Sequence, residues 1–112
     1  MARVTSAQLS VDEKRTAQES ILTLTGEIDM ATAGELFAAA QRALLDPPNR
    51  VVLDFAGVTF CDSRGLSTLL LLNKAATAAG SSLVLVNVGD YLQRLLDITG
   101  LRAALTVEEP SA

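Results

Sequence analysis

Apolar and polar positions along the chain divide its first part into two strand-like segments. Residues 4–11 alternate weakly and predict an edge strand, and the polar residues 14–18 predict a turn. Residues 21–25, Ile-Leu-Thr-Leu-Thr, are rich in β-branched side chains and predict a second strand, which is expected to stop at Gly26. Because only a short turn separates the two strands, we expect them to pair antiparallel.

A helix is predicted after this strand pair. Thr32 is a good N-cap residue, and Glu35, three positions later, completes a capping box. The helix should end at 46–48, Asp-Pro-Pro, because proline cannot continue the hydrogen-bond ladder. Its apolar residues recur with helical spacing and form one face: Ala33, Leu36, Phe37, Ala40 and Leu44.

The rest of the chain continues the alternation of strands and helices. The predicted elements are a strand at 51–55, a helix at 64–79, a strand at 83–86, a helix at 90–98 with Leu92, Leu95 and Leu96 inward, a last strand at 105–107 and a frayed tail at 108–112. The strand at 83–86 is wholly apolar, as expected when both of its faces are covered. Successive strand–helix–strand units imply parallel pairing with right-handed crossovers.

The predicted fold class is therefore α/β. We expect a small, mostly parallel sheet of four to five strands with an antiparallel first strand and three to four helices. The chain has 112 residues, which predicts a single domain over 1–112.

Composition narrows the functions to consider. The net charge is −4, and the nine basic residues are scattered, so we expect no direct nucleic-acid partner. One cysteine and no histidine leave no internal disulfide and no typical zinc site, and no metal or cofactor is expected. The absence of a leader-like start and of a long apolar run predicts a cytoplasmic protein without a membrane segment.

The candidate chemistry lies in the turn at 58–66, Val-Thr-Phe-Cys-Asp-Ser-Arg-Gly-Leu. It follows a strand, and sites in open α/β sheets lie beyond the carboxyl ends of the strands. Ser63 begins a predicted helix, so its hydroxyl is expected to cap free backbone N–H groups. Alternatively, Ser63 is a phosphoacceptor. The helix dipole would tolerate a phosphate there, whereas the added charge beside Asp62 would repel a docking partner.

Four motifs occur in an order and spacing that resemble a known family. They are Gly26-Glu27-Ile28-Asp29 followed by Thr32-Ala33; Val51-Val52-Leu53-Asp54 with Val58-Thr59-Phe60; Asp62-Ser63-x-Gly65-Leu66; and Leu92-x-x-Leu95-Leu96-Asp97-Ile98-Thr99-Gly100-Leu101. From about residue 5 to residue 107 the chain resembles the anti-sigma factor antagonists, which are stand-alone STAS domains.

The resemblance implies a regulatory function by partner switching. Such proteins bind an anti-sigma factor that is also an ATP-dependent serine kinase of the GHKL type, which frees a sigma factor for transcription, often in a stress response. The kinase phosphorylates the serine after the aspartate, Ser63 here, and the complex dissociates. A PP2C-type phosphatase reverses the modification. The residues expected to bind the partner are Asp29, Asp62, Ser63, Arg64, Gly65 and Leu66.

Several residues of the site have two interpretations. Arg64 stands where the family usually has Ser or Thr; it could pair with the phosphate or select a kinase with an acidic docking surface. Cys61 is interpreted as a small buried apolar residue, with a redox role as the alternative. Asp29 either touches the partner or shapes the turn before the first helix. Either Leu71 or Leu72 should be partly exposed, because the helix cannot hide every leucine on one face, whereas Leu66, Leu69 and Leu70 fit its core stripe.

Two other classes of function are weaker. Cys61-x-Ser63-x-Gly65 partly matches the nucleophile elbow of hydrolases, but that chemistry needs a histidine base, so we do not expect an enzyme. A STAS domain can also be a docking subunit of a transporter or of a stress-sensing assembly, without phosphorylation. The intact Asp62-Ser63 pair favours the switch.

Overall fold

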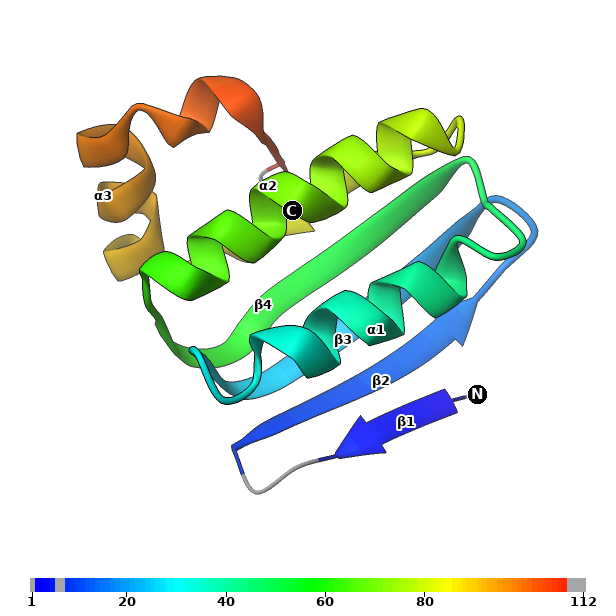
Figure 1. The fold of residues 1–112 in the computed structure, drawn as a ribbon, viewed down its shortest axis with the longest axis horizontal. Coiled ribbons are helices and arrows are strands. Elements are labelled where there is room, and N and C mark those ends of the chain that lie inside the picture. The colour runs from blue at the N-terminus through cyan, green and yellow to red at the C-terminus, as the bar shows by residue number, and fades with distance from the viewer. Residues whose placement is uncertain (1, 6–7, 109–112) are drawn as a thin grey trace.

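The computed structural model describes residues 2–5 and 8–108, which form a layer of strands and a layer of helices (Figure 1). The strands are β1 (Ala2–Thr5), β2 (Leu9–Arg15), β3 (Glu19–Ile28), β4 (Arg50–Cys61), β5 (Ser82–Val86) and β6 (Thr106–Glu108). The helices are α1 (Ala33–Ala43), α2 (Ser63–Ala78), α3 (Asp90–Thr99) and the short 3-10 helix η1 (Leu101–Ala104).

The strands lie in the sheet in their chain order. β1 pairs antiparallel with β2 and β2 pairs antiparallel with β3, whereas β3, β4, β5 and β6 are parallel neighbours. Helices provide the long crossovers that parallel neighbours require. The predicted α/β class with a mostly parallel sheet and an antiparallel start is confirmed. The sheet, however, has six strands rather than four to five.

The additional strand lies at the amino-terminal edge of the sheet. Residues 4–11 are predicted as one strand, but they belong to two strands of a hairpin, in which Val4 pairs with Val11. Leu9 and Val11 alone carry the buried alternation of β2. Because two short strands follow each other closely, their patterns merge in the sequence into one weakly alternating segment.

The turn between β2 and β3 is shorter than the predicted 14–18. β2 continues to Arg15, and the turn is closed by the Thr16 hydroxyl oxygen, which accepts the N–H groups of Gln18 at 3.2 Å and Glu19 at 3.1 Å. A threonine side chain therefore replaces the missing ladder partners at this end of the hairpin.

Gly26 does not end its strand, since β3 continues to Ile28. Its φ of 115° is rarely adopted by other residues, and a Cβ built on it would lie 2.1 Å from the Gln8 carbonyl oxygen. The Glu27 N–H donates to that same oxygen at 2.8 Å. Gly26 thus forms an irregularity that lets the backbone before β2 approach β3 closely, as bulged glycines do.

β4 is much longer than the predicted 51–55. It stays paired with β3 up to the pair Ile28–Cys61, with register shifts on the way. The added part is mostly exposed or half-buried, so it carries no strand-like apolar pattern that the sequence could reveal. Its length brings Cys61 to the end of β3, where the next helix begins.

The core lies between one face of the sheet and the helices. α1 and α2 lie side by side across this face in Figure 1, and α3 contributes to the same core cluster. Val84 does not belong to this cluster, although it is buried. The prediction that both faces of the strand at 83–86 are covered is confirmed, since Leu83, Val84 and Leu85 are all buried, although the described helices pack on the Leu83 and Leu85 face. Val84 faces away from the helices, beside Val52 on β4.

Thr32 precedes α1 as predicted, but the capping box does not form. The Thr32 hydroxyl donates to the Glu27 carbonyl at 2.8 Å and accepts the Asp29 N–H at 3.0 Å, and it makes no cap bond to the helix. This threonine is fully buried, so its hydroxyl must satisfy the turn around it.

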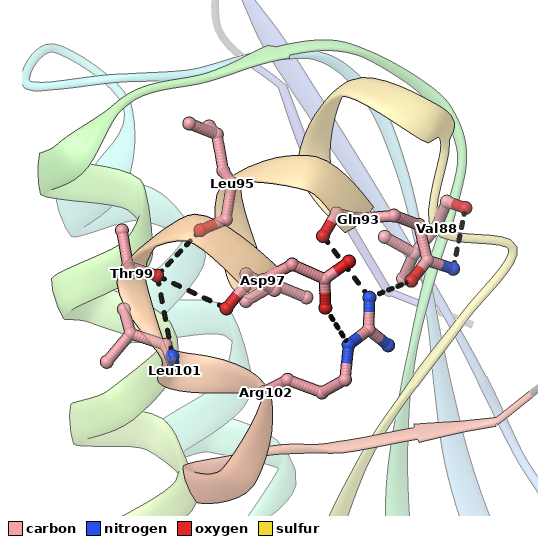
Figure 2. Close-up of polar contacts among 8 residues, drawn as sticks. Val88, Gln93, Leu95, Asp97, Thr99, Leu101 and Arg102 are labelled. Carbon is pink, nitrogen blue, oxygen red and sulfur yellow. Dashed lines mark hydrogen bonds and ion pairs between the residues drawn. The ribbon is translucent and has the colours of Figure 1, made fainter.

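Polar contacts hold η1 against α3, as Figure 2 shows. Arg102 of η1 pairs with Asp97 (Nε–Oδ1, 2.6 Å) and donates to the main-chain oxygen of Gln93 at 3.2 Å and to its side-chain oxygen. Gly100 joins the two helices in a left-handed conformation, with a φ of 75°. The chain therefore reverses sharply after α3 and enters β6.

The sequence predicts that Glu108 belongs to a frayed tail, but it is the last residue of β6. It pairs with Val86 in the ladder, and its carboxylate lies 3.1 Å from Nη2 of Arg50. The strand lies one residue later than the predicted 105–107. The remainder of the predicted tail, 109–112, lies outside the described residues.

Candidate functional site

Two turns meet at the carboxyl ends of β3 and β4. The Asp62 N–H, after β4, donates to the Ile28 carbonyl at 3.1 Å, at the end of β3. Asp29 and Ser63 therefore lie in neighbouring turns, although more than thirty positions separate them in the chain. This is the edge of the sheet at which the sequence predicted a site.

Asp62 is the N-cap of α2. Its backbone is extended (φ −97°, ψ −170°), and Oδ1 accepts the Gly65 N–H at 3.0 Å. The prediction that Ser63 is the N-cap is therefore wrong: Ser63 is the first residue of the helix. Aspartate and serine are both good caps, so the sequence Asp62-Ser63 allowed either assignment, and the position where β4 leaves the sheet decides it.

The Ser63 hydroxyl is accessible to solvent. Its side chain is exposed, and within the described residues it has no hydrogen-bond partner; only its carbonyl is engaged, by the Ser67 hydroxyl at 3.0 Å. The hydroxyl lies at the positive end of the dipole of a 16-residue helix, a place that favours added negative charge. Chemistry at this oxygen breaks no internal bond.

Three small or apolar residues pack beneath the Ser63 turn, on its buried side. Cys61 is buried, as predicted, and Leu66 is also part of the core. Burial, together with the neighbouring Asp62 charge, raises the pKa of the Cys61 thiol to about 12. A neutral thiol of this kind packs as an apolar group. Gly65 is buried too, and it supports the turn in this structure, as Leu66 does. The contact of these two residues with a partner stays a prediction.

Asp29 shapes its own turn. Its Oδ1 accepts the N–H groups of Ala31 at 2.9 Å and Thr32 at 3.2 Å, which is the pattern of an Asx turn. The turn-shaping interpretation is thus confirmed. The side chain is half-buried, and its contact with a partner stays a prediction.

The leucines of α2 divide between the core and the surface. Leu66, Leu69 and Leu72 are buried, Leu70 is half-buried, and Leu71 is 55% exposed. Of the two leucines that the sequence left open, Leu71 is therefore the exposed one. It lies on the side of α2 that faces α1.

A groove runs between α1 and α2 next to the Ser63 turn. It is lined by side chains from both helices and from the turn before α1, including Met30, Gly34, Phe37, Arg64, Ser67 and Leu71. Met30 is 74% exposed. Sequence reasoning missed Met30 and Phe37: Phe37 fits the core stripe of its helix, and nothing in the sequence shows that Met30 lines the same groove as Leu71.

A second, smaller hollow lies at the end of β4, just before the turn. Phe60 and Tyr91 are large exposed side chains, and both line it together with Cys61 and Leu92. Along the chain, Ser63 thus follows residues that line this hollow, Phe60 and Cys61, and precedes Arg64, which lines the groove. Exposed aromatic and apolar side chains that gather in this way are typical of protein–protein contact surfaces.

The described residues offer little for other kinds of site. No three His, Cys, Asp or Glu side chains gather there closely enough to hold a metal ion. None of the helices in this part of the chain is long and apolar enough to span a membrane. The arrangement instead offers an exposed hydroxyl, an exposed cation at Arg64 and apolar side chains around them.

Comparison with known proteins identifies the family. The family described as "Mlab, STAS domain" matches residues 11–107. An anti-sigma-B factor antagonist of Staphylococcus epidermidis is 31% identical over 84 residues, which are 75% of this chain and 78% of that protein. The chain belongs to the STAS family of anti-sigma factor antagonists. The resemblance expected from the four sequence motifs is therefore confirmed.

Solved structures agree with the fold of this STAS domain. A crystal structure of an anti-sigma factor antagonist from Mycobacterium paratuberculosis superimposes with a TM-score of 0.81 at 25% identity, covering 96% of this chain and 92% of that one. The phosphorylated form of the Bacillus cell fate determinant SpoIIAA has a TM-score of 0.70 at 17% identity, covering 90% of this chain and 91% of that one. The latter likeness concerns the fold alone.

Proposed function

We propose that this STAS domain is an anti-sigma factor antagonist that binds an anti-sigma factor through the surface around Ser63. The names of its relatives support this function, since the Staphylococcus epidermidis protein is an anti-sigma-B factor antagonist. Binding would take the anti-sigma factor away from its sigma factor and so permit transcription. The proposal places the chain in the cytoplasm, where sigma factors act.

The observation that carries the proposal is the exposed Ser63 hydroxyl at the start of α2. Asp62, not Ser63, caps the helix, so the fold does not need this hydroxyl. In phosphorylation by an ATP-dependent serine kinase of the GHKL type, the γ-phosphoryl group of ATP is transferred to Oγ of Ser63. ADP leaves, and the hydroxyl proton passes to the kinase or to water. A PP2C-type phosphatase would hydrolyse the phosphoester and restore the hydroxyl.

The phosphate would act by charge. It adds about 1.5 to 2 negative charges to the exposed turn, next to the carboxylate of Asp62. A partner surface that fits the neutral hydroxyl then meets like charges or a strongly hydrated group, and binding weakens. The helix dipole stabilises the same phosphate, so the domain itself stays folded. The result is a switch in binding without unfolding.

The decisive experiment is intact-mass measurement with purified anti-sigma factor kinases from the organism that encodes the chain. Incubation with one of these kinases and ATP should add one phosphate to the wild-type chain and none to Ser63→Ala. The unmodified chain should bind the same kinase, and the phosphorylated chain should bind it at least about tenfold more weakly. A phosphate that also appears on Ser63→Ala would refute Ser63 as the acceptor.

The alternative function is a docking subunit of a transporter or stress-sensing assembly that is never phosphorylated. It uses the same exposed surface, so the structure accommodates it equally. The two functions differ in one measurement: a docking subunit binds its partner equally well as wild type and as Ser63→Asp, whereas the switch loses binding in Ser63→Asp.

A further inference from the structure

We propose that the groove between α1 and α2 receives a segment of the anti-sigma factor in which an apolar side chain lies next to a carboxylate. Arg64 would bind the carboxylate, and the groove wall formed by Met30 and Leu71 would receive the apolar side chain. This inference rests on the proposed function, because it describes how the same partner is recognised.

The apolar part of the groove is open to solvent. Met30 is 74% exposed and Leu71 55% exposed, and both line the groove together with Phe37. Single exposed apolar side chains are ordinary, but several that gather in a hollow favour contact with another protein. On the α1 side of the groove, Gly34 has no side chain. A Cβ built at Gly34 meets no atom within 4 Å, so there is room there for an incoming side chain.

The charged part of the groove is Arg64. Its side chain is exposed and forms no hydrogen bond or ion pair within the described residues. It also lies in the first turn of α2, where no acidic residue is present and the helix dipole disfavours a cation. An incoming carboxylate would be attracted by both the guanidinium and the helix terminus. The chain as a whole carries a net charge of −4, which repels acidic groups. The attraction of Arg64 for a carboxylate is therefore local and acts against the overall charge.

The position of the groove connects it to the switch. Arg64 directly follows Ser63, and the groove extends from there along α2 to Leu71. A phosphate on Ser63 would place about 1.5 to 2 negative charges where the partner's carboxylate has to bind, and it would compete for the same guanidinium. Phosphorylation would then expel this segment of the partner without any movement of the helices. Of the two interpretations of Arg64, the groove favours the selection of an acidic partner.

Two substitutions test the groove. Arg64→Glu reverses the charge, and Leu71→Asp places a carboxylate in the apolar wall. Each should weaken binding of the purified anti-sigma factor kinase at least about tenfold. Each should also raise the KM for phosphorylation of Ser63 while kcat stays the same. Matched controls are Arg42→Glu on α1 and Ile98→Asp on α3, because both residues are exposed and neither lines the groove.

A charge exchange tests the carboxylate directly. Single surface Asp or Glu residues of the kinase are changed to Lys. At least one of these kinase variants should bind the Arg64→Glu chain more tightly than it binds the wild-type chain. Melting curves of all variants verify the fold, and Leu71→Ser replaces Leu71→Asp if the latter does not fold. The groove proposal is wrong if Arg64→Glu and the Leu71 variant bind like wild type while Ser63 still gains its phosphate. A wild-type chain that neither binds the kinase nor gains phosphate overturns the proposed function and the groove together.

Discussion

At the scale of single residues, the lack of space at position 65 explains why the site motif contains a glycine there. A Cβ at this position would lie 2.6 Å from Sγ of Cys61, 2.9 Å from Cγ2 of Ile28 and 3.1 Å from the Ile28 carbonyl oxygen. The first turn of α2 therefore rests directly on the ends of β3 and β4. The absence of a side chain at one position sets how close the Ser63 turn lies to Asp29.

Gly65→Ala should destabilise the protein by about 1–3 kcal/mol, because the new methyl group overpacks this contact. Gly34→Ala is the matched control: it also lies in the first turn of a helix, but its Cβ meets nothing within 4 Å. Alanine there should stabilise α1 by up to about 1 kcal/mol. Urea unfolding measures both values. Equal effects of the two substitutions would contradict the close contact, and Cys61→Ala in the Gly65→Ala background should recover part of the loss.

At the scale of elements, two adjacent residues at the start of α2 have different roles. One caps the helix and the other presents a hydroxyl, whereas the sequence predicts both roles for Ser63. Asp62 satisfies a free N–H of the helix, and Ser63 presents a hydroxyl to solvent. Spacing alone predicts that a helix begins here, and that prediction is right within a residue. Which of two adjacent capping residues leaves the helical conformation depends on where β4 stops pairing with β3.

Asp62→Ala should lower the free energy of unfolding by about 0.5–2 kcal/mol, because the helix loses its cap. Ser63→Ala should leave stability nearly unchanged, and Ser63→Asp should raise it by about 0.3–1 kcal/mol through the helix dipole. Thermal and urea unfolding of the three variants provide the comparison. A loss in Ser63→Ala as large as that in Asp62→Ala would return the capping role to Ser63 and weaken the case for a dispensable hydroxyl.

At the scale of the whole molecule, Arg50 on β4 connects the neighbouring strand β3 with β6, which lies two strands away on the other side. From the start of β4 its guanidinium reaches Glu19 on β3 at 3.2 Å and Glu108 on β6 at 3.1 Å. β5 lies between β4 and β6, so the side chain passes over β5 on the face away from the helices. There Val52 and Val84 are buried although no described helix covers them. Long arginine stems can cover apolar surface in this way.

Arg50→Ala and Arg50→Met separate the charge from the stem. Both lose the ion pairs, which are partly exposed and so contribute only about 0.2–1 kcal/mol. Arg50→Met keeps an apolar stem over the valines, whereas Arg50→Ala uncovers them and should cost about 1–2 kcal/mol more. Urea unfolding in low and high salt checks both parts, since only the ion-pair part should depend on salt. Equal losses in the two variants would show that the stem covers nothing.

The sequence by itself determined the α/β class, the helices and the parallel order of the inner strands. Those features follow from local periodicity, from the proline and glycine signals and from short connections. All of these can be identified in the sequence alone. The motif around Ser63 was also visible, because its residues are contiguous.

The tertiary structure alone decided the remaining features. The hairpin at the edge, the passage of β3 through Gly26 and the long end of β4 depend on pairing with neighbouring strands, which override local pattern. The groove beside Ser63 is lined by Met30 and Leu71, which come from two distant segments. Periodicity describes which side chains share a face of one element, but only the packing of elements against each other decides which exposed faces meet.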